Sequence, residues 1–259
     1  LITLNNSGTV VSNFPYETSG WPEQLSYFLL TNNSVSCFGG NDGSISGLPG
    51  GGTVNSLNDY SFSWSGPNNY SSNSEDINNL QEGTYLVTVS DLNNCLSPPT
   101  AVQVTQPENL IASSSVTSNF NGFSIDCNGN STGQASVSIS GGTQPYNVIS
   151  WSGPNNYSSN SQNISGLSVG NYNVIVTDAN DCQSNNSSIN LTQPSSVQIE
   201  LSADDVSCNT FSDGSITSTI NGGVPGYSYN WSGPNGFSSI SQNVNGIVAG
   251  QYSLDVSDA

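Results

Sequence analysis

An eleven-residue segment that recurs almost unchanged constrains this chain more than any other feature. The sequence WSGPNNYSSNS occupies residues 64–74 and, identically, residues 151–161, and the variant WSGPNGFSSIS occupies residues 231–241. The positions of these copies define a unit of about 80 to 87 residues. A period of this kind is typical of repeated domains. The chain is therefore predicted to consist of tandem copies of one fold.

Proline-containing triplets mark the limits of the units. Thr105-Gln106-Pro107 and Thr192-Gln193-Pro194 fall at matching points. Proline cannot donate a hydrogen bond within a central sheet ladder, so it suits a boundary. The predicted segments are the end of a preceding domain or a linker at 1–22, followed by repeats at 23–107, 108–194 and 195–259. The third repeat is interpreted as truncated.

Alternation of apolar residues predicts β-strands in every unit. One predicted strand in each unit has a tyrosine followed by apolar residues at every second position: Tyr85, Val87 and Val89; Tyr172, Val174 and Val176; Tyr252, Leu254 and Val256. Turn residues recur every eight to twelve positions, and no apolar pattern of helical period is present. The pattern predicts an all-β class, with tandem Ig-like β-sandwich repeats in an elongated array.

Two finer predictions concern the strands around the repeated tryptophan. The spacing Leu80-x-x-Gly83-x-Tyr85 resembles a tyrosine corner, so the tyrosine hydroxyl should bond back to the backbone, while the tryptophan fills the centre of the sandwich. The second unit has one extra residue between Tyr146 and Trp151. It is predicted to form a β-bulge near Val148 or Ile149.

Five cysteines occupy equivalent places in the units. Cys37 and Cys95 bracket the first repeat, and Cys127 and Cys182 bracket the second with nearly the same separation, so one disulfide is expected within each repeat. Cys208 stands alone, and its partner is expected about four residues beyond Ala259. A zinc site is the alternative, but the chain has no histidine and no C-x-x-C motif. Disulfides imply an extracellular location.

The composition excludes several classes of function. Lys, Arg, His and Met are all absent, and the formal net charge is −18. A Ser-His-Asp triad, a Cys-His pair and a Schiff-base lysine therefore cannot be built. Nucleic acid is excluded as a partner, because such binding depends on cations placed along phosphates. No apolar run of about 20 residues exists, so membrane insertion is not expected.

Carboxylate pairs that could serve a glycosidase are few. Glu75-Asp76 and Asp204-Asp205 are the adjacent pairs, and neither pair recurs in all units. Adjacent residues of a strand also point to opposite faces of the sheet, whereas a glycosidase needs both carboxylates in one cleft. The chain is therefore predicted not to be an enzyme, with no catalytic residues and no cofactor.

Two acidic turns are weak candidates for calcium binding. Each turn directly precedes a cysteine, and the candidate ligands are Asp91, Asn93, Asp178, Asn180 and Asp181. Calcium prefers six to eight oxygen ligands, which such turns could supply in part. The alternative is that these side chains bond to their own backbone in a tight turn. No EF-hand or nonapeptide calcium motif supports the metal.

Aromatic residues that follow the Gly-Pro-Asn turn are weak candidates for ligand binding. Tyr70 and Tyr157 follow this turn in the first two repeats, and Phe237 takes their place in the third. An aromatic ring on a rigid turn is suited to stack on a sugar. The alternative is that these rings are core side chains.

The units resemble the SprB repeat of Bacteroidetes gliding-motility adhesins. The first unit carries the motifs C-x-G-G-x-D-G-S, W-S and L-x-x-G-x-Y-x-V-x-V-x-D-x-N-x-C, formed by Cys37, Gly39, Gly40, Asp42, Gly43, Ser44, Trp64, Leu80, Gly83, Tyr85, Val87, Val89, Asp91, Asn93 and Cys95. The second unit departs from the pattern at Thr132, which stands where the first has Asp42. The third lacks the closing cysteine.

This resemblance implies a very large bacterial cell-surface protein, exported by the type IX secretion system of gliding bacteria and moved along the surface. The segment is then a non-enzymatic structural or adhesive stalk. Its expected partners are neighbouring repeats of the same polypeptide, with surface glycans or the cell-surface machinery as further candidates. The alternatives are an extracellular glycan-binding module and a subunit of a surface filament, held through an exposed strand edge.

Overall fold

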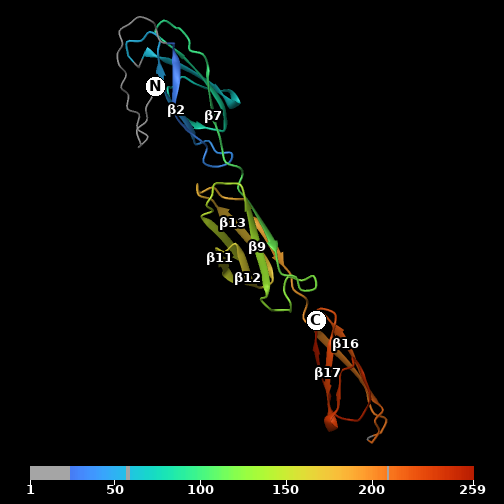
Figure 1. Cartoon of the computed structure of the whole chain (residues 1–259). Helices are drawn as coiled ribbons and strands as arrows, with labels where there is room; N and C mark the ends of the chain where they lie inside the picture. Colours follow the sequence, from blue (N-terminus) through green and yellow to red (C-terminus); the bar gives the residue numbers. More distant parts are fainter. Residues whose placement is uncertain (1–23, 57–58, 209) are drawn as a thin grey trace. The chain divides into compact units, whose positions relative to one another are not determined.

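Two small antiparallel sheets make up the first repeat (Figure 1). We describe a computed structural model of the chain, in which residues 24–56, 59–208 and 210–259 are described. One sheet has the order β1-β2-β5 and the other the order β4-β3-β6-β7. The bounds are β1 (Ser26–Asn33), β2 (Gly43–Gly50), β3 (Ser61–Gly66), β4 (Tyr70–Ser72), β5 (Ile77–Leu80), β6 (Gly83–Ser90) and β7 (Thr100–Val104).

The second and third repeats reproduce this topology. Their three-stranded sheets have the orders β12-β9-β8 and β15-β16-β19, and the facing sheets have the orders β11-β10-β13-β14 and β18-β17-β20. In the second repeat the bounds are β8 (Ile111–Val116), β9 (Gly133–Ser140), β10 (Val148–Gly153), β11 (Tyr157–Ser159), β12 (Asn163–Leu167), β13 (Gly170–Thr177) and β14 (Ser187–Leu191). In the third they are β15 (Gln198–Asp204), β16 (Gly214–Asn221), β17 (Ser228–Ser232), β18 (Ser238–Ser239), β19 (Val244–Ile247) and β20 (Ser253–Ser257).

The fold is therefore all-β with two facing sheets in each repeat, as the sequence predicted. Among the residues described, helical structure is limited to single 3₁₀ turns such as η2 (Pro67–Asn69), η3 (Pro154–Asn156) and η4 (Pro234–Gly236). None of them is long or apolar enough to cross a membrane. The chain divides into two compact units at Pro107/Glu108. Residues 1–22, assigned above to a preceding domain or linker, lie outside the described part.

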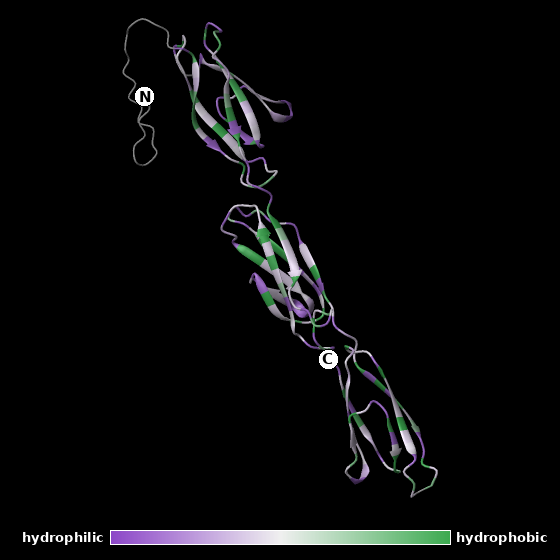
Figure 2. Cartoon of the chain, turned by 45° about the vertical axis from the view of Figure 1, so that its right-hand side comes forward, coloured by the Kyte–Doolittle hydropathy of each residue, from purple (hydrophilic) through white to green (hydrophobic). Residues whose placement is uncertain are grey.

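Each repeat is built around a separate core that contains its tryptophan. Trp64, Trp151 and Trp231 are 2%, 1% and 0% exposed. Apolar side chains of the strands surround each indole, and along the strands hydrophobic and hydrophilic residues alternate (Figure 2). The prediction that the tryptophan fills the centre of the sandwich is confirmed.

The repeated eleven-residue segment is a hairpin that closes on its own tryptophan. The indole N–H of Trp151 donates to the carbonyl of Ser161, the last residue of the segment, at 3.0 Å, and Trp64 and Trp231 make the same bond to Ser74 and Ser241 at 2.9 Å. The 3₁₀ turn between the two strands holds two consecutive residues at positive φ, such as Asn155 and Asn156 at 55° and 59°. Asparagine and glycine tolerate this conformation, which explains the Pro-Asn-Asn and Pro-Asn-Gly sequences.

The tyrosine corner is confirmed in all three repeats. The hydroxyls of Tyr85, Tyr172 and Tyr252 donate to the carbonyls of Gln81, Ser168 and Val248, at 3.1, 3.1 and 3.0 Å. Each bond reaches back four residues and ties the start of the strand to the turn before it.

The predicted β-bulge near Val148 or Ile149 is wrong. The ladder between β10 and β13 runs without interruption from Val148↔Thr177 to Ser152↔Asn173. The extra residue lies at Tyr146–Asn147, in the connection before β10. There the hydroxyl of Tyr146 donates to the carbonyl of Gly141, as Tyr60 does to Gly51 in the first repeat. A connection absorbs an additional residue without breaking a ladder, so the strand keeps its register.

The third repeat has a thinner core than the second. Strand β20 has a single neighbour, β17, whereas β13 lies between β10 and β14. Tyr172, Val174 and Val176 on β13 are buried. Their counterparts are only partly buried: Tyr252, which directly precedes β20, and Leu254 and Val256 on β20.

We expect Tyr172→Phe to destabilise the chain by about 1 kcal/mol, because the carbonyl of Ser168 loses its hydrogen bond while the buried ring remains. Tyr157→Phe is the matched control, since its partly exposed ring packs on Tyr172 and is retained. Urea unfolding of both variants measures the difference. Equal stabilities would contradict an energetic role for the tyrosine corner.

Candidate functional site

The two acidic turns are organised around a buried aspartate. Asp178 is fully buried, and its carboxylate accepts hydrogen bonds from the backbone amides of Thr143, Asn180 and Cys182 at 2.8, 2.9 and 3.0 Å. Two of these donors lie in the turn that follows β13. The third lies in the loop after β9, so the carboxylate joins the two sheets of the repeat.

The same arrangement recurs in the other repeats. Asp91 accepts hydrogen bonds from the amides of Thr53, Asn93 and Cys95 at 2.9, 3.0 and 2.9 Å. In the third repeat the carboxylate of Asp258 accepts one from the amide of Val224 at 2.8 Å. We call each of these an aspartate clamp.

Hydrogen bonding to the backbone stabilises the ionised form of these carboxylates. The amide of Thr53, followed by that of Cys95, lowers the pKa of Asp91 below its ordinary value. Burial acts to raise the pKa of Asp178, but hydrogen bonds from Thr143, Cys182 and Asn180 outweigh it and leave this pKa lowered as well. Both clamps therefore hold charged carboxylates at neutral pH.

Glycine pairs make the clamps possible, and the sequence analysis missed them. The loop that meets each aspartate contains two consecutive glycines at positive φ: Gly51-Gly52, Gly141-Gly142 and Gly222-Gly223. A Cβ on Gly142 would lie 2.9 Å from Oδ2 of Asp178, and one on Gly223 would lie 2.6 Å from Oδ2 of Asp258. The available signal was the recurrence of Gly-Gly at the same place in each repeat.

The calcium candidates thus lie in turns where side chains bind backbone. Asp91 and Asp178 engage amides as described, and the side-chain amide of Asn180 donates to the hydroxyl of Thr143 at 3.2 Å. Asp181 adopts a positive φ of 63° in its tight turn, as does Asn94, which follows Asn93, at 59°. Within the described ranges, no group of three or more His, Cys, Asp or Glu side chains is placed to hold a metal.

The aromatic candidates pack against the tyrosine corners. Tyr70, Tyr157 and Phe237 are partly buried, and their rings lie edge-to-face on Tyr85, Tyr172 and Tyr252, with centroids 5.2, 5.3 and 5.3 Å apart. Each of these rings is therefore in contact with an aromatic ring of its own repeat. Sugar stacking on these residues stays a prediction.

The carboxylate pairs are also engaged within the strands. Asp76 accepts a hydrogen bond from the amide of Gly47 at 3.2 Å, and Asp204 accepts one from the hydroxyl of Ser215 at 3.1 Å. Desolvation, followed by the charge of Asp76, raises the pKa of Glu75. Each pair thus has a partner on the adjacent strand β2 or β16.

The two predicted disulfides within repeats are not formed. Cys37 and Cys182 are disulfide-bonded, whereas Cys95, Cys127 and Cys208 are free and exposed. Each predicted pair, Cys37 with Cys95 and Cys127 with Cys182, therefore combines a bonded cysteine with a free one. Within the described residues Cys208 is also free.

The two cysteines of a repeat lie at opposite ends of its sandwich, so they are too far apart to form a disulfide with each other. Near Cys37, the amide of Gly39 donates to the side chain of Gln106, just beyond the end of β7 that pairs with the start of β6. The carbonyl of Cys95 instead accepts from Asp91, after the other end of β6. Eight strand residues separate the two ends, roughly 25 Å at the usual rise, whereas a disulfide needs Cα atoms about 4 to 7 Å apart.

The second repeat has the same polarity. The amide of Gly129, near Cys127, donates to the side chain of Gln193 at 3.0 Å, whereas the carbonyl of Cys182 accepts from the amide of Asp178 at 3.0 Å after the far end of β13. We call the end that carries Cys37, Cys127 or Cys208 the opening pole, and the end that carries Cys95 or Cys182 the closing pole.

Thr132 is the position at which the second repeat departs from the sequence motif. There the aspartate and its hydrogen-bonding partner have exchanged places in the sequence. In the first repeat Asp42 accepts from the amide of Ser36 at 2.9 Å, and Asp213 accepts from Ser207 in the same way at 3.0 Å. In the second repeat the aspartate stands at the serine position, and Asp126 accepts from the hydroxyl of Thr132 at 2.7 Å. The exchanged residues therefore still link the two sides of the opening turn.

A family model of the SprB repeat matches residues 124–156 and 201–236. The second and third repeats therefore each contain a segment that matches the SprB repeat. The first match begins at the opening pole of the second repeat and the second begins within β15 of the third, and both end in the tryptophan hairpin. The first repeat, which carries the sequence motifs in full, is not among the matched residues. No curated protein matches the chain in sequence.

Solved structures of other multidomain proteins are distantly similar to this chain. A tetra-tandem repeat in the extending region of a large adhesion protein is 10% identical with a TM-score of 0.33, over 89% of this chain and 64% of that one. Extracellular domains 3–5 of Drosophila OTK are 10% identical with a TM-score of 0.25, over 92% and 95%. The BSP domain of a biofilm associated protein is 9% identical with a TM-score of 0.25, over 93% and 62%. The chain thus spans less than two thirds of the first of these.

The aspartate clamps predict how stability depends on pH. Because the pKa values of Asp91 and Asp178 are lowered in the folded state, their contribution is present above the unfolded pKa, about 4, and is lost as the pH falls through the folded value. Asp178→Asn and Asp91→Asn should each lower the urea midpoint at pH 7, and the deficit should shrink below about pH 4.

Asp255→Asn on β20 is the matched control for both variants, since it removes one negative charge from an exposed side chain. It should retain the parent's urea midpoint across the same pH range. A deficit that is equal at all pH values in the clamp variants would contradict the role of the charged carboxylate.

Calcium should leave the thermal midpoint unchanged, because the clamp oxygens already accept backbone amides. Melting curves in millimolar calcium and in chelator test this expectation. A rise of several degrees with calcium would show that the native state binds the ion, and its loss in Asp178→Asn would assign the ion to a clamp.

Proposed function

We propose that this chain is a mechanical spacer within the stalk of a large, non-enzymatic bacterial cell-surface adhesin. The hydrogen bonding between the first and last strands of a repeat carries this proposal. In the second repeat the amide of Ser114 on β8 donates to the hydroxyl of Ser187 on β14 at 2.9 Å, and the amide of Ala112 donates to the side chain of Asn185 at 3.3 Å.

The two terminal strands run in the same direction. Beyond β8 and β14, the amide of Ile125 donates to the carbonyl of Thr192 at 3.1 Å, so partner residues advance together along both segments. A force applied to the two ends of a repeat therefore slides these segments past each other and loads several hydrogen bonds at once. The first repeat has the same ties, such as Asn32 to the carbonyl of Gln103 at 2.7 Å.

The distribution of polar groups supports a structural role over a catalytic one. The carboxylates of the clamps, the indole N–H groups and the corner hydroxyls all bind groups of their own repeat. The buried side-chain nitrogen and oxygen atoms of the described residues all have hydrogen-bond partners. The buried polar side chains of the described residues thus act within the fold.

The SprB repeats support an extracellular location on the surface of a bacterium. Export by type IX secretion and movement during gliding are part of the same proposal. Binding of surface glycans belongs to other regions of the full protein in this scheme. The absence of Lys and Arg also leaves the chain without a cleavage site for trypsin-like proteases.

Single-molecule stretching under reducing conditions tests the spacer function. Repeats of this size should unfold one at a time and each release on the order of 25 nm of chain. Removing the tie in the second repeat, with Asn185→Ala and Ser187→Ala together, should lower the force of one unfolding event. The first repeat in the same molecule serves as the internal control.

Unfolding at uniformly low force, unchanged by this double variant, would contradict the mechanical proposal. Binding of the isolated chain to particular sugars on a glycan array would favour the glycan-binding alternative. Assembly of the chain into filaments, detected by sizing in solution, would favour the filament alternative.

A further inference from the structure

Three consecutive apolar side chains of the first repeat are exposed on an edge strand. Phe28, Leu29 and Leu30 lie on β1, at the edge of the sheet β1-β2-β5, and are 50%, 45% and 40% exposed. The ladder places Phe28 opposite Leu48 of β2, which is also 40% exposed. Runs of exposed apolar residues on a soluble surface mark interaction sites. We call these four residues the β1 strip.

The other two repeats carry polar residues at the place of this cross-strand pair. Leu48 is the fifth residue after the glycine that begins β2, and the same count along β9 and β16 gives Ser138 and Thr219. Their partners on the edge strands are Ser113 and Glu200. The β1 strip is therefore specific to the first repeat, and the shared fold does not require it.

The backbone of the β1 strip is open at the edge of the sheet. The amide of Gly47, which lies opposite Leu29, donates to the carboxylate of Asp76 at 3.2 Å and therefore points away from β1. In an antiparallel ladder the partners in such a pair exchange no hydrogen bonds, so Leu29 directs its amide and carbonyl toward the free edge. Tyr27, two residues earlier on the strand, has the same orientation.

Side chains cover the equivalent amides in the second repeat but not in the first. Asn185 and Ser187 accept hydrogen bonds from the two corresponding amides of β8. In the first repeat Pro98 and Thr100 stand at these places. A proline side chain accepts no hydrogen bond, and in the described part of the chain no side chain accepts one from the amide of Leu29.

The open edge is limited to the first half of β1. The register shifts by one residue at Leu30, which interrupts the regular ladder. Beyond this point the side-chain amide of Asn32 donates to the carbonyl of Gln103 at 2.7 Å, so the second half of the strand is held against β7. The segment that can accept another strand therefore covers residues 26–30.

We propose that this segment pairs with the same segment of a second copy of the chain. Antiparallel pairing about a two-fold axis at Phe28 places Tyr27 of each copy opposite Leu29 of the other, and it uses no residue beyond the open segment. The two three-stranded sheets join at their edges, and the β1 strips of both copies lie together on one face. Such a contact closes at two copies and builds no filament. The inference goes beyond the spacer function and does not depend on it.

Charge favours a second copy as the partner. The chain has 18 acidic residues and no basic one, so two copies repel each other over most of their surfaces. Residues 25–41 contain no carboxylate. The exposed edge strand β15 of the third repeat instead carries Glu200 and Asp204, and like charges at an edge oppose pairing. The edge of β1 is thus one at which two copies meet without opposing charges.

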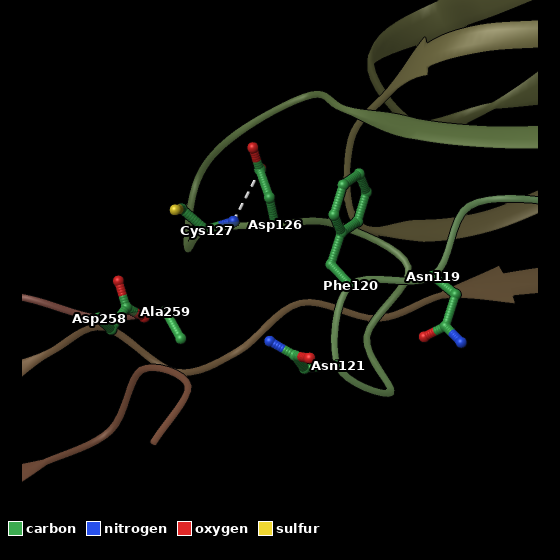
Figure 3. A pocket seen from close by; sticks show the side chains of 7 residues that line it. All are labelled: Asn119, Phe120, Asn121, Asp126, Cys127, Asp258 and Ala259. Carbon is green, nitrogen blue, oxygen red and sulfur yellow. Dashed lines mark hydrogen bonds between the residues drawn. The ribbon is translucent and has the colours of Figure 1, made fainter. Parts of the chain in front are cut away.

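An aromatic side chain of the second repeat, Phe120, does not offer a comparable site. Phe120 lines a pocket that also contains the carboxylate of Asp126 (Figure 3). Hydrogen bonds from the side chains of Thr132 and Asn130 lower the pKa of Asp126, so this carboxylate is charged at neutral pH. A second copy would bring the same negative charge to this place.

Sedimentation of the 259-residue chain under reducing conditions tests the proposal. Reduction excludes dimers that are held by the exposed thiols of Cys95, Cys127 and Cys208. We expect a monomer–dimer equilibrium with a dissociation constant roughly in the micromolar range, as small interfaces give. The dimer should tighten as salt is added, because salt screens the repulsion between the copies. A chain that stays monomeric at every salt concentration, or that grows beyond dimers, would overturn the proposal.

Substitutions taken from the third repeat locate the contact. Phe28→Glu together with Leu48→Thr reproduces the pair found there, and it should weaken the dimer about tenfold or more, since a central aromatic ring is lost and like charges are added. Leu86→Glu is the matched control, because it places the same charge on a side chain of β6 that is 43% exposed. It should leave the dimer intact. Equal weakening by both changes would assign the effect to net charge and overturn the proposal.

Hydrogen exchange of the unaltered chain provides a readout that needs no variant. The amides of Tyr27 and Leu29 should exchange more slowly at concentrations where the dimer is populated, because they become hydrogen-bonded between the copies. The amide of Ser114, already bonded to Ser187, is the internal control and should exchange equally at all concentrations. A dimer without protection of β1 would overturn the proposal. Because no unfolding force is measured, the spacer function is tested separately.

Discussion

The lack of any basic side chain is the physical constraint on which the rest of this structure depends. A carboxylate here has no Lys, Arg or His to pair with, so a buried one must be stabilised by backbone amides and hydroxyls. The aspartate clamps satisfy this requirement with up to three amides each. Because those amides come from two different loops, the charge that most needs stabilisation also joins the two sheets.

The clamp, the tyrosine corner and the tryptophan hairpin each stabilise a different part of a sandwich with a thin core. The clamp closes one end of β13, and the bond of Tyr172 to Ser168 fixes the other end. Between them, Trp151 fills the core and satisfies its own indole N–H within the hairpin. A repeat with a modest number of apolar residues thus keeps its two sheets in register through a few specific polar bonds. The recurrence of the same three devices explains why the unit repeats so closely in sequence.

The sequence predicted correctly the features that depend on the local pattern of residues. It did not predict correctly the cysteine pairing, which depends on the end of the sandwich at which each cysteine lies. Tryptophan burial, the tyrosine corner and the all-β class follow from spacing within one strand and its turn. The cysteine pairing did not, because the nearly equal separations of Cys37 from Cys95 and of Cys127 from Cys182 reflect the repetition of the unit and not proximity in space. The direction of the strands decides whether two cysteines are close. In the structure, β6 and β13 each run from one end of the sandwich to the other between the two cysteines of their repeat.

The glycine pairs beside the clamps could not be recognised from the sequence for a related reason. A Gly-Gly pair reads as a turn in any sequence, and only the carboxylate 2.9 Å from a Cβ placed on Gly142 shows why a side chain is not accommodated there. The extra residue near Tyr146 shows the opposite case, in which sequence suggested a distortion of the strand and the preceding connection absorbed it. Both cases occur in the loop between β9 and β10: its glycine pair beside the clamp does not accommodate a side chain, whereas its end before β10 accommodates an additional residue.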